Sequence, residues 1–219
     1  MVEQLRELDL DTVRANLERV RAEIARARRD PAGVEVLVAV KYVPVELMEV
    51  LAQAGVRVVG ENRAQELLAK ARAHPGRFTW DFIGQLQSRK VKQLLGNVRY
   101  IHSVASDSVL EQLRRHAAPE TEVLVEVNVA GETGKSGVQP GHLEAFLGRC
   151  PVSVAGLMTM PPQAASAQDS RAHFTQLRKL AEEHGLRELS MGTSQDYVVA
   201  LQEGATILRL GSRLLRPPT

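Results

Sequence analysis

The sequence contains little cysteine and few aromatic residues. Cys150 is the one cysteine among 219 residues, so the chain can form neither an internal disulfide nor a cysteine cluster for a metal, as is typical of a reducing compartment. Cys150 precedes Pro151 with no helix start beside it, which favours an unreactive thiol over a nucleophile. Aromatic residues make up 4% of the chain, and no basic motif with interleaved aromatics is present, which disfavours nucleic acid as a partner.

Long apolar runs and a strong excess of charge are also missing. No uninterrupted apolar stretch approaches the ~20 residues of a membrane span, and residues 1–10 carry acidic side chains without the apolar core of a signal peptide. These features predict a cytoplasmic protein with no membrane partner. The net charge is +2, and the densest basic stretch, Arg19–Arg29, alternates with acidic and small residues, as is typical of a solvated helix face.

What is present is the composition of an ordinary globular protein, with 44% hydrophobic and 25% charged residues. The length allows one large domain or two small ones. Apolar residues recur at helical spacing from Leu5 to Ala27, with no glycine or proline between them, which predicts an opening helix. The β-branched run Val34–Val40 then indicates a strand that is buried on both faces.

Strand and helix patterns alternate from there to the end of the chain. Further strands are expected at Val56–Val59, Thr79–Ile83, Val98–Ile101, Glu122–Val129, Ser153–Leu157, Glu188–Leu189 and Thr206–Leu210. The helices between them are expected at Val45–Ala54, Arg63–Ala73, Val91–Leu95, Ser106–His116, Leu143–Gly148, Ser166–His184 and Gln195–Glu203.

This alternation predicts the α/β class, because each return to the same edge of a parallel sheet needs a helix. Eight strand and helix units fit a closed (β/α)8 TIM barrel. An open doubly wound sheet is the alternative, but the residues after the first strand, 41–44, contain no glycine-rich dinucleotide turn. We therefore expect a single barrel domain over residues 1–219, with an extra N-terminal helix.

In such a barrel the functional site lies where the strands end. Polar residues follow the predicted strands at Lys41, at Gly60–Asn62, at Gly84–Ser88, at Ser190–Ser194, and at Arg209 with Gly211 and Ser212. Lys41 directly continues an apolar strand, where loss of hydration favours a neutral, nucleophilic amine that can form a Schiff base. A lysine that turns outward to solvent is the alternative.

Two adjacent loops have the composition of a phosphate site. Ser190–Ser194 precedes a predicted helix and Gly211 with Ser212 follows the last strand, and the loops after strands seven and eight are the usual phosphate site of barrels. A plain helix cap at Ser194 and a plain turn at Gly211 are the alternatives. Together with Lys41, these loops indicate a phosphorylated carbonyl ligand.

Other polar residues are less informative. Arg209 is expected inside the barrel or at its rim, where its acceptor is either a ring nitrogen or a glutamate, Glu61 or Glu126. The segment Gly131–Ser136 ends in Gly-Lys-Ser, but two residues separate its glycines where a P-loop needs four, so no nucleotide triphosphate site is expected. The six histidines show no metal-ligand spacing, so we expect no metal and place all of them, including His102, at the surface or at helix caps.

The chain resembles a known family at these segments and at others between them. The matching motifs are 38–41 with Pro44, 60–62 with 65–66, Trp80–Ser88, 125–128 with 135–137, 156–161, 190–194 with Asp196, and 209–212. In this order, and nearly end to end, they resemble the pyridoxal phosphate homeostasis proteins, which bind pyridoxal 5′-phosphate (PLP) in a barrel like the N-terminal domain of alanine racemase.

The resemblance implies a role for each matching residue. Lys41 is similar to the lysine that holds PLP as a Schiff base, and Arg209 to the arginine that faces the pyridine nitrogen. The remaining cofactor-binding positions that the resemblance implies are Asn62 and Met158 along the ring, with Ser190, Ser194, Gly211 and Ser212 around the phosphate. Lys135 is similar to a second lysine near the mouth of the site. An arginine at the ring nitrogen stays charged and weakens the ring as an electron sink.

The chain departs from the family pattern at a few positions. Many relatives have serine before the Schiff-base lysine and a second lysine two residues after it, where this chain has Val40 and Val43. Asp81 replaces the usual histidine, and Arg89 replaces an asparagine. These departures bear on any relay of the cofactor between neighbouring lysines.

By resemblance, the expected function is that of a carrier and buffer in intracellular PLP homeostasis, with no catalytic residue of its own. The racemases of this class add a β domain, which we do not find, and Tyr42 is expected to point away from Lys41 along an extended chain. A small monomeric PLP-dependent amino-acid racemase is the second hypothesis, and an RNA- or protein-binding module built on Arg19–Arg29 is the third. The expected partners are PLP and PLP-dependent apo-enzymes, and the protein is expected to be a monomer.

Overall fold

The structure is a computed structural model and describes residues 4–28, 30–162 and 165–217. Its strands pair in parallel and in chain order, and the last pairs with the first, which closes a barrel. The strands are β1 (Glu35–Ala39), β2 (Val58–Glu61), β3 (Thr79–Phe82), β4 (Tyr100–Val104), β5 (Glu122–Glu126), β6 (Ser153–Met158), β7 (Glu188–Ser190) and β8 (Ile207–Leu210).

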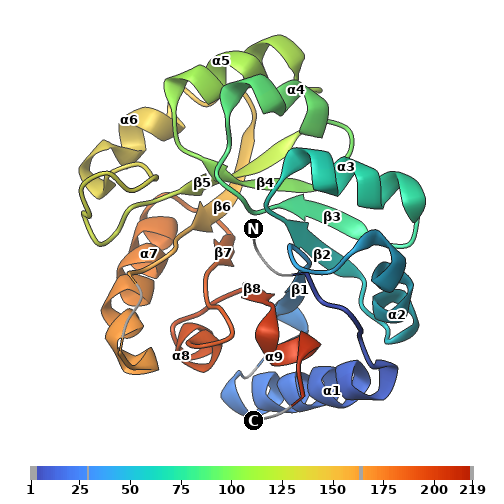
Figure 1. Cartoon of the computed structure of the whole chain (residues 1–219). Coiled ribbons are helices and arrows are strands. Elements are labelled where there is room, and N and C mark those ends of the chain that lie inside the picture. The colour runs from blue at the N-terminus through green and yellow to red at the C-terminus, as the bar shows by residue number, and fades with distance from the viewer. Residues whose placement is uncertain (1–3, 29, 163–164, 218–219) are drawn as a thin grey trace.

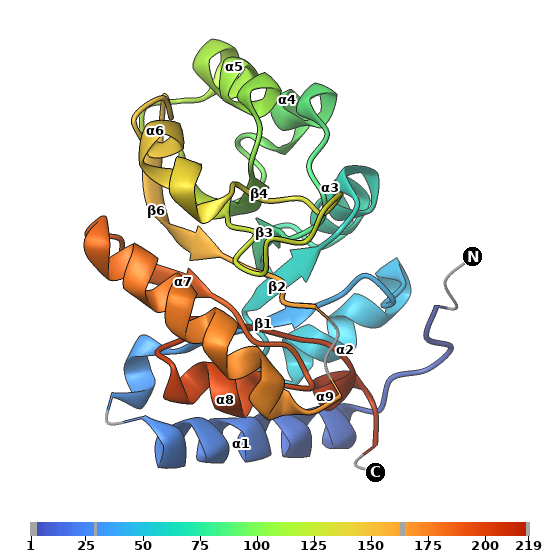
Figure 2. The ribbon, with the colours of Figure 1, turned by 90° about the vertical axis from the view of Figure 1, so that its left-hand side faces the viewer.

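The helices form a ring around the barrel (Figure 1). They are α1 (Leu10–Ala27), α2 (Met48–Gln53), α3 (Ala64–Ala73), α4 (Val91–Leu94), α5 (Asp107–His116), α6 (Leu143–Leu147), α7 (Arg171–Glu183), α8 (Tyr197–Gln202) and α9 (Ser212–Leu215). The long helix α1 packs against α8 and α9 (Figure 2). The predicted barrel with its N-terminal helix is confirmed, and the closed strand order excludes an open doubly wound sheet. No helix in the described ranges is long and apolar enough to cross a membrane.

The strands are buried on both faces, as their apolar sequences predict. Every residue of β2, β4 and β8 is buried. Because successive side chains of a strand alternate between faces, one set contacts the helices and the other fills the barrel. The interior set includes Leu37, Tyr100, Leu124 and Ile207. Arg209 lies two residues after Ile207 and therefore shares its inward face.

Several element boundaries differ from the sequence-based expectations. Helix α1 begins at Leu10 rather than Leu5, because the Asp9 side chain accepts the N–H of Thr12 (2.7 Å) and caps the helix there. Strands β2 and β4 begin two residues later than expected. They extend into polar residues that the apolar pattern did not mark as strand, since the interior of this barrel contains paired polar groups. Helix α9 was not expected.

Candidate functional site

A cavity of about 290 Å³ lies at the carboxyl ends of strands β1, β2, β7 and β8. Its lining residues are Leu5, Ala39, Lys41, Tyr42, Asn62, Ile83, Met160, Thr193, Ser194, Gln195, Arg209, Gly211, Ser212, Leu215 and Arg216. Segments that are far apart in the sequence thus meet at one end of the barrel, as the strand alternation predicted. The size is near the lower end of the range for small-molecule sites.

Lys41 lines the cavity from the turn that follows β1, but its side chain is exposed, so the expected loss of hydration is not observed and the alternative of a lysine turned to solvent fits better. The chain does not stay extended there, because the N–H of Val43 donates to the carbonyl of Val40 (3.0 Å) and closes a turn. Tyr42 consequently lines the same cavity as Lys41, and the Nζ of Lys41 lies 4.8 Å from the centroid of the Tyr42 ring. The expectation that Tyr42 points away from Lys41 is therefore wrong.

A buried ion pair lies directly behind this turn. The Nζ of Lys70 donates to Oε2 of Glu61 (2.5 Å) and to the carbonyl of Val40 (2.8 Å), the residue before Lys41. Oε1 of Glu61 in turn accepts the N–H of Asn62 (2.6 Å). The pair therefore joins the ends of β1 and β2 and holds the backbone of both Lys41 and Asn62.

Asn62 lines the cavity and carries an unsatisfied acceptor. Its Oδ1 is buried, and no hydrogen-bond partner for it exists in the described part of the chain. Gly84 packs against the backbone of the same residue, and a Cβ on Gly84 would lie 2.0 Å from the carbonyl oxygen of Asn62. Only glycine fits there, so the predicted segment Gly84–Ser88 supports the position of Asn62 through this close approach.

Hydrogen bonds join the loops after β7 and β8 into one wall. The Oγ of Ser194 accepts the N–H of Gly211 (3.2 Å) and the N–H of Arg213 (3.1 Å). Thr193 donates its N–H (2.7 Å) and its hydroxyl (3.0 Å) to Oδ1 of Asp196. Ser194 is therefore not the cap of the helix that follows it, since α8 begins after Asp196; it bonds instead to backbone N–H groups at the start of α9, which brings the two predicted loops together.

Arg209 extends from β8 into the barrel and is 6% exposed. Its guanidinium donates to Oγ of Ser190 (2.6 Å), to the carbonyl of Thr159 (2.8 Å) and to the Sδ of Met160 (2.8 Å). Burial is the largest influence on its pKa and lowers it to about 10, against the raising effect of the Asp196 and Glu126 charges. The side chain therefore stays charged at neutral pH with only neutral acceptors in contact.

The ion pair expected between Arg209 and either Glu61 or Glu126 is not formed. Glu61 is paired with Lys70, and Glu126 accepts the hydroxyl of Ser136 (2.8 Å). Three of the five N–H groups of the guanidinium donate to the acceptors named above, and the described residues provide no acceptor for the other two.

Some of the expected site residues lie elsewhere. Met158 is buried in the interior cluster of the barrel, and Ser190 is fully buried beneath Arg209; neither lines the cavity. The methionine that does line it is Met160, two residues further along and on the same face. Lys135 is exposed outside the cavity and pairs with Glu132 (2.5 Å).

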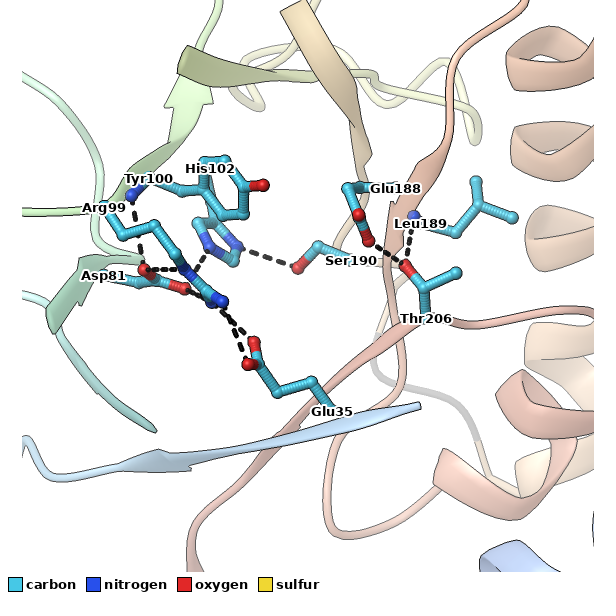
Figure 3. Close-up of polar contacts among 9 residues, drawn as sticks. All are labelled: Glu35, Asp81, Arg99, Tyr100, His102, Glu188, Leu189, Ser190 and Thr206. Carbon is cyan, nitrogen blue, oxygen red and sulfur yellow. Dashed lines mark hydrogen bonds and ion pairs between the residues drawn. The ribbon is translucent and has the colours of Figure 1, made fainter. Parts of the chain in front are cut away.

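His102 is not at the surface or at a helix cap, so the expectation for this histidine is wrong. It is fully buried in β4, where its Nδ1 lies 2.9 Å from Oγ of Ser190 and its Nε2 lies 3.0 Å from Oδ2 of Asp81 (Figure 3). The apolar pattern missed this part of β4, because a buried histidine interrupts it. In the described ranges no three His, Cys, Asp or Glu side chains form a metal site.

Comparisons with known proteins agree with this architecture. The model of the family described as alanine racemase, N-terminal domain, matches residues 8–215. A pyridoxal phosphate homeostasis protein of Aquifex aeolicus is 41% identical over 212 residues, covering 90% of this chain and 93% of that protein. The corresponding protein of Pseudomonas aeruginosa is 35% identical, with 94% and 95% covered.

Solved structures give the same result. PipY of Synechococcus elongatus, solved with PLP bound, is 30% identical with a TM-score of 0.79, covering 93% of this chain and all of that one. Alanine racemase of Corynebacterium glutamicum, at 16% identity and a TM-score of 0.72, shares the fold across 65% of its own chain. The chain therefore belongs to the pyridoxal phosphate homeostasis protein family, and its barrel is of the alanine racemase N-terminal type.

Proposed function

We propose that the chain is a single, monomeric PLP-binding domain that holds PLP as a Schiff base on Lys41 and acts as a carrier and buffer in PLP homeostasis. The observation that carries the proposal is one cavity that combines an amine, two joined loops of the phosphate-binding type, and an arginine that contacts no carboxylate in the described part of the chain. The names of the relatives and the PLP in PipY support it.

The polar groups of the cavity fit those of PLP. PLP offers an aldehyde, a phenolic oxygen, a ring nitrogen and a phosphate. The cavity offers the amine of Lys41, the amide side chain of Asn62, the spare N–H groups of Arg209, and the hydroxyl and backbone groups of Ser194 and Ser212. Each polar group of PLP thus finds a side chain or loop of matching chemistry.

The residues have separate tasks in this proposal. The Nζ of Lys41 forms a C=N bond with the aldehyde carbon, and the aldehyde oxygen leaves as water, so the link is reversible by hydrolysis. Ser194, Gly211 and Ser212 hold the phosphate, and Asn62 contacts the ring. Met158 and Ser190 act from beneath the cavity rather than at its surface. Arg209 keeps its charge at the ring nitrogen and disfavours protonation there, which limits the electron-sink chemistry that catalysis requires.

The proposal is tested by adding PLP, reducing with borohydride and mapping the labelled peptide. We expect one predominant label at Lys41 and its loss in Lys41→Ala. Lys135→Ala is the matched control, because Lys135 is an exposed lysine outside the cavity, and its label pattern should equal that of the wild type. A label that spreads over surface lysines in the wild type would refute the assignment.

A racemase remains the second candidate, because Tyr42 lies in the cavity beside Lys41 and a second acid or base is what racemisation needs. Exchange of the α-proton of amino acids in deuterium oxide separates the two functions. A carrier gives no exchange above that of free PLP. Exchange that is catalysed by the wild type and lost in Tyr42→Phe would establish the enzyme.

A further inference from the structure

A chain of buried polar side chains runs through the barrel beneath the cavity. It starts at Arg209, whose Nη1 lies 2.6 Å from Oγ of Ser190, and continues to Nδ1 of His102 at 2.9 Å. The Nε2 of His102 lies 3.0 Å from Oδ2 of Asp81, which also accepts from Arg99 at 2.6 Å. Figure 3 shows the chain from Ser190 onward, with its members contributed by different strands.

The direction of each hydrogen bond follows from the chemistry of the groups. A guanidinium can only donate, so Ser190 accepts from Arg209 and has its own proton free to donate to His102. A carboxylate only accepts, so the Nε2 of His102 carries the proton that it donates to Asp81. The His102 ring is then neutral with Nδ1 as an acceptor, and from Arg209 to His102 each group donates toward Asp81, which accepts from Arg99 on its other side.

The surroundings agree with this assignment. Burial lowers the pKa of His102 and is its largest influence, opposed by the bond to Asp81. The pKa of Asp81 is also lowered, since its bonds to His102 and Arg99 outweigh the effect of burial. Arg99 also pairs with Glu35 at 2.5 Å, so its one positive charge is shared by two carboxylates at the far end of the chain.

Ser190, His102 and Asp81 thus form a serine–histidine–aspartate row, but one that cannot serve as a nucleophilic triad. All three side chains are buried with no exposed surface, and none of them lines the cavity. The Ser190 oxygen also accepts from a cation already. A substrate cannot reach it, so the row must act through Arg209.

We propose that Ser190, His102 and Asp81 are positioning residues that fix the guanidinium of Arg209 toward the cavity while leaving its charge uncompensated. This inference rests on the proposed function, because it assigns to the row the control of how Arg209 meets the ring nitrogen of PLP. A carboxylate in place of Ser190 would neutralise Arg209. A neutral hydroxyl that is itself oriented by His102 holds the group in place and leaves the positive charge available to the ligand.

The test uses Ser190→Ala, with Thr206→Val as the matched control. Thr206 belongs to a neighbouring polar pair, in which its hydroxyl donates to Glu188 (2.7 Å) and accepts the N–H of Leu189 (2.8 Å), without contact to Arg209 (Figure 3). We expect Ser190→Ala to weaken PLP binding about tenfold, as for the loss of one hydrogen bond to a charged group. We also expect the absorption of bound PLP to become pH-dependent, because a mobile Arg209 no longer disfavours protonation of the ring nitrogen.

Thr206→Val should leave both the affinity and the pH profile as in the wild type. The inference is overturned if Ser190→Ala keeps the wild-type affinity and profile. It is also overturned if the two variants change equally, because the effect is then one of barrel stability.

A second readout needs no cofactor. Nitrogen NMR of the apo-protein should show His102 as the neutral Nε2–H tautomer, and should show resolved Nη signals of Arg209 that coalesce in Ser190→Ala but not in Thr206→Val. A charged His102 or the opposite tautomer refutes the donor chain. If borohydride finds no label at Lys41 while these NMR signatures hold, the proposed function fails and the positioning of Arg209 stands.

Discussion

Lys70 and Glu61 show how one buried pair supports the residues on either side of it. Both side chains are almost fully buried, at 2% and 1% exposure, and they are 2.5 Å apart. Taking two charges out of water is costly, and the pair is retained only because further hydrogen bonds satisfy it, here to the carbonyl of Val40 and the N–H of Asn62. Those two backbone groups adjoin the cavity, so the ion pair helps to hold Lys41 and Asn62 in position.

Lys70→Met should therefore destabilise the protein strongly. It leaves Glu61 buried without a counter-charge, which costs roughly 3–5 kcal/mol in such pairs. The free energy of unfolding from urea titration measures the effect. Adding Glu61→Gln to Lys70→Met should restore much of the loss, because no unpaired charge then remains. A loss below about 1 kcal/mol in the single variant would contradict the prediction.

The buried His102 and Asp81 predict a pH dependence of stability. The pKa of His102 is lowered from 6.5 in the folded state, so the unfolded chain binds more protons as the pH falls through that value. The pKa of Asp81 is lowered from 3.8, so its contribution is present above that value and lost in more acidic solution. Both effects make the folded state less stable as the pH decreases.

Urea unfolding at a series of pH values between neutral and mildly acidic checks this. Below the unfolded-state pKa of His102, its contribution should reduce the free energy of unfolding by up to about 1.4 kcal/mol per pH unit. His102→Asn removes the titrating ring and should flatten this part of the profile. An unchanged slope in His102→Asn would show that other groups are responsible.

The residues of the site differ in how far the sequence could predict them. Lys41, Asn62, Ser194 and Arg209 stand at strand ends in a strict alternation, and the structure places all four in one cavity. The position of Tyr42 does not follow from the sequence pattern, because a turn and not an extended chain follows β1. Met160 was missed although strand parity would have indicated it, since it shares the face of Met158.

At the scale of elements, Asn16 joins α1 to α9. Its side chain is 2% exposed, and its Nδ2 donates to the carbonyls of Leu214 (3.2 Å) and Arg216 (2.8 Å) at the end of α9. The last carbonyls of a helix have no partner within it, so Asn16 satisfies groups that would otherwise be buried unpaired. Arg216 also lines the cavity, which connects this contact to the site.

Asn16→Ala should lower the free energy of unfolding by about 1–3 kcal/mol, because it leaves buried carbonyls unsatisfied. Asn97→Ala is the control, since Asn97 also donates to two backbone carbonyls at a helix end but is exposed, and surface changes of this kind fall within about 0.5 kcal/mol. The free energies of unfolding of both variants, measured by chemical denaturation, test this prediction. Equal losses would mean that burial does not set the cost.

The bounds of the helices and strands can be predicted from the sequence where the pattern is apolar. The prediction fails where polar groups are buried. Helix α5 lies close to its expected range because a cap marks its start, and strand β5 begins where expected but ends at Glu126, three residues before the expected end. Strand β4 was placed too early because His102 and Ser103 end its apolar run, although both are paired inside the barrel. Helix α9 has four residues, too few for a helical period to appear in the sequence.

At the scale of the whole molecule, barrel closure brings the first and last strands together. Strand β1 pairs with β8, so Lys41 near the start of the chain faces Arg209, Gly211 and Ser212 near its end. The sequence predicts that these residues lie at one end of a barrel, but it does not give the distances between them. The site therefore exists only in the closed barrel, and any ligand that contacts both sides binds the folded state alone.

Such binding should stabilise the whole fold by mass action. At 100 times its dissociation constant, PLP should add about 2.7 kcal/mol, or raise the midpoint of thermal unfolding by roughly 5–10 °C for a chain of this length. Differential scanning calorimetry measures the shift. Pyridoxal at the same concentration should give a much smaller one, because it keeps the aldehyde for Lys41 but has no phosphate for the loops at Ser194 and Ser212. Equal stabilisation by PLP and pyridoxal would mean that the loops do not bind the phosphate. Equal stabilisation of Lys41→Ala and the wild type would mean that the amine of Lys41 does not bind the aldehyde. Either result would contradict a ligand that contacts both sides of the closed barrel.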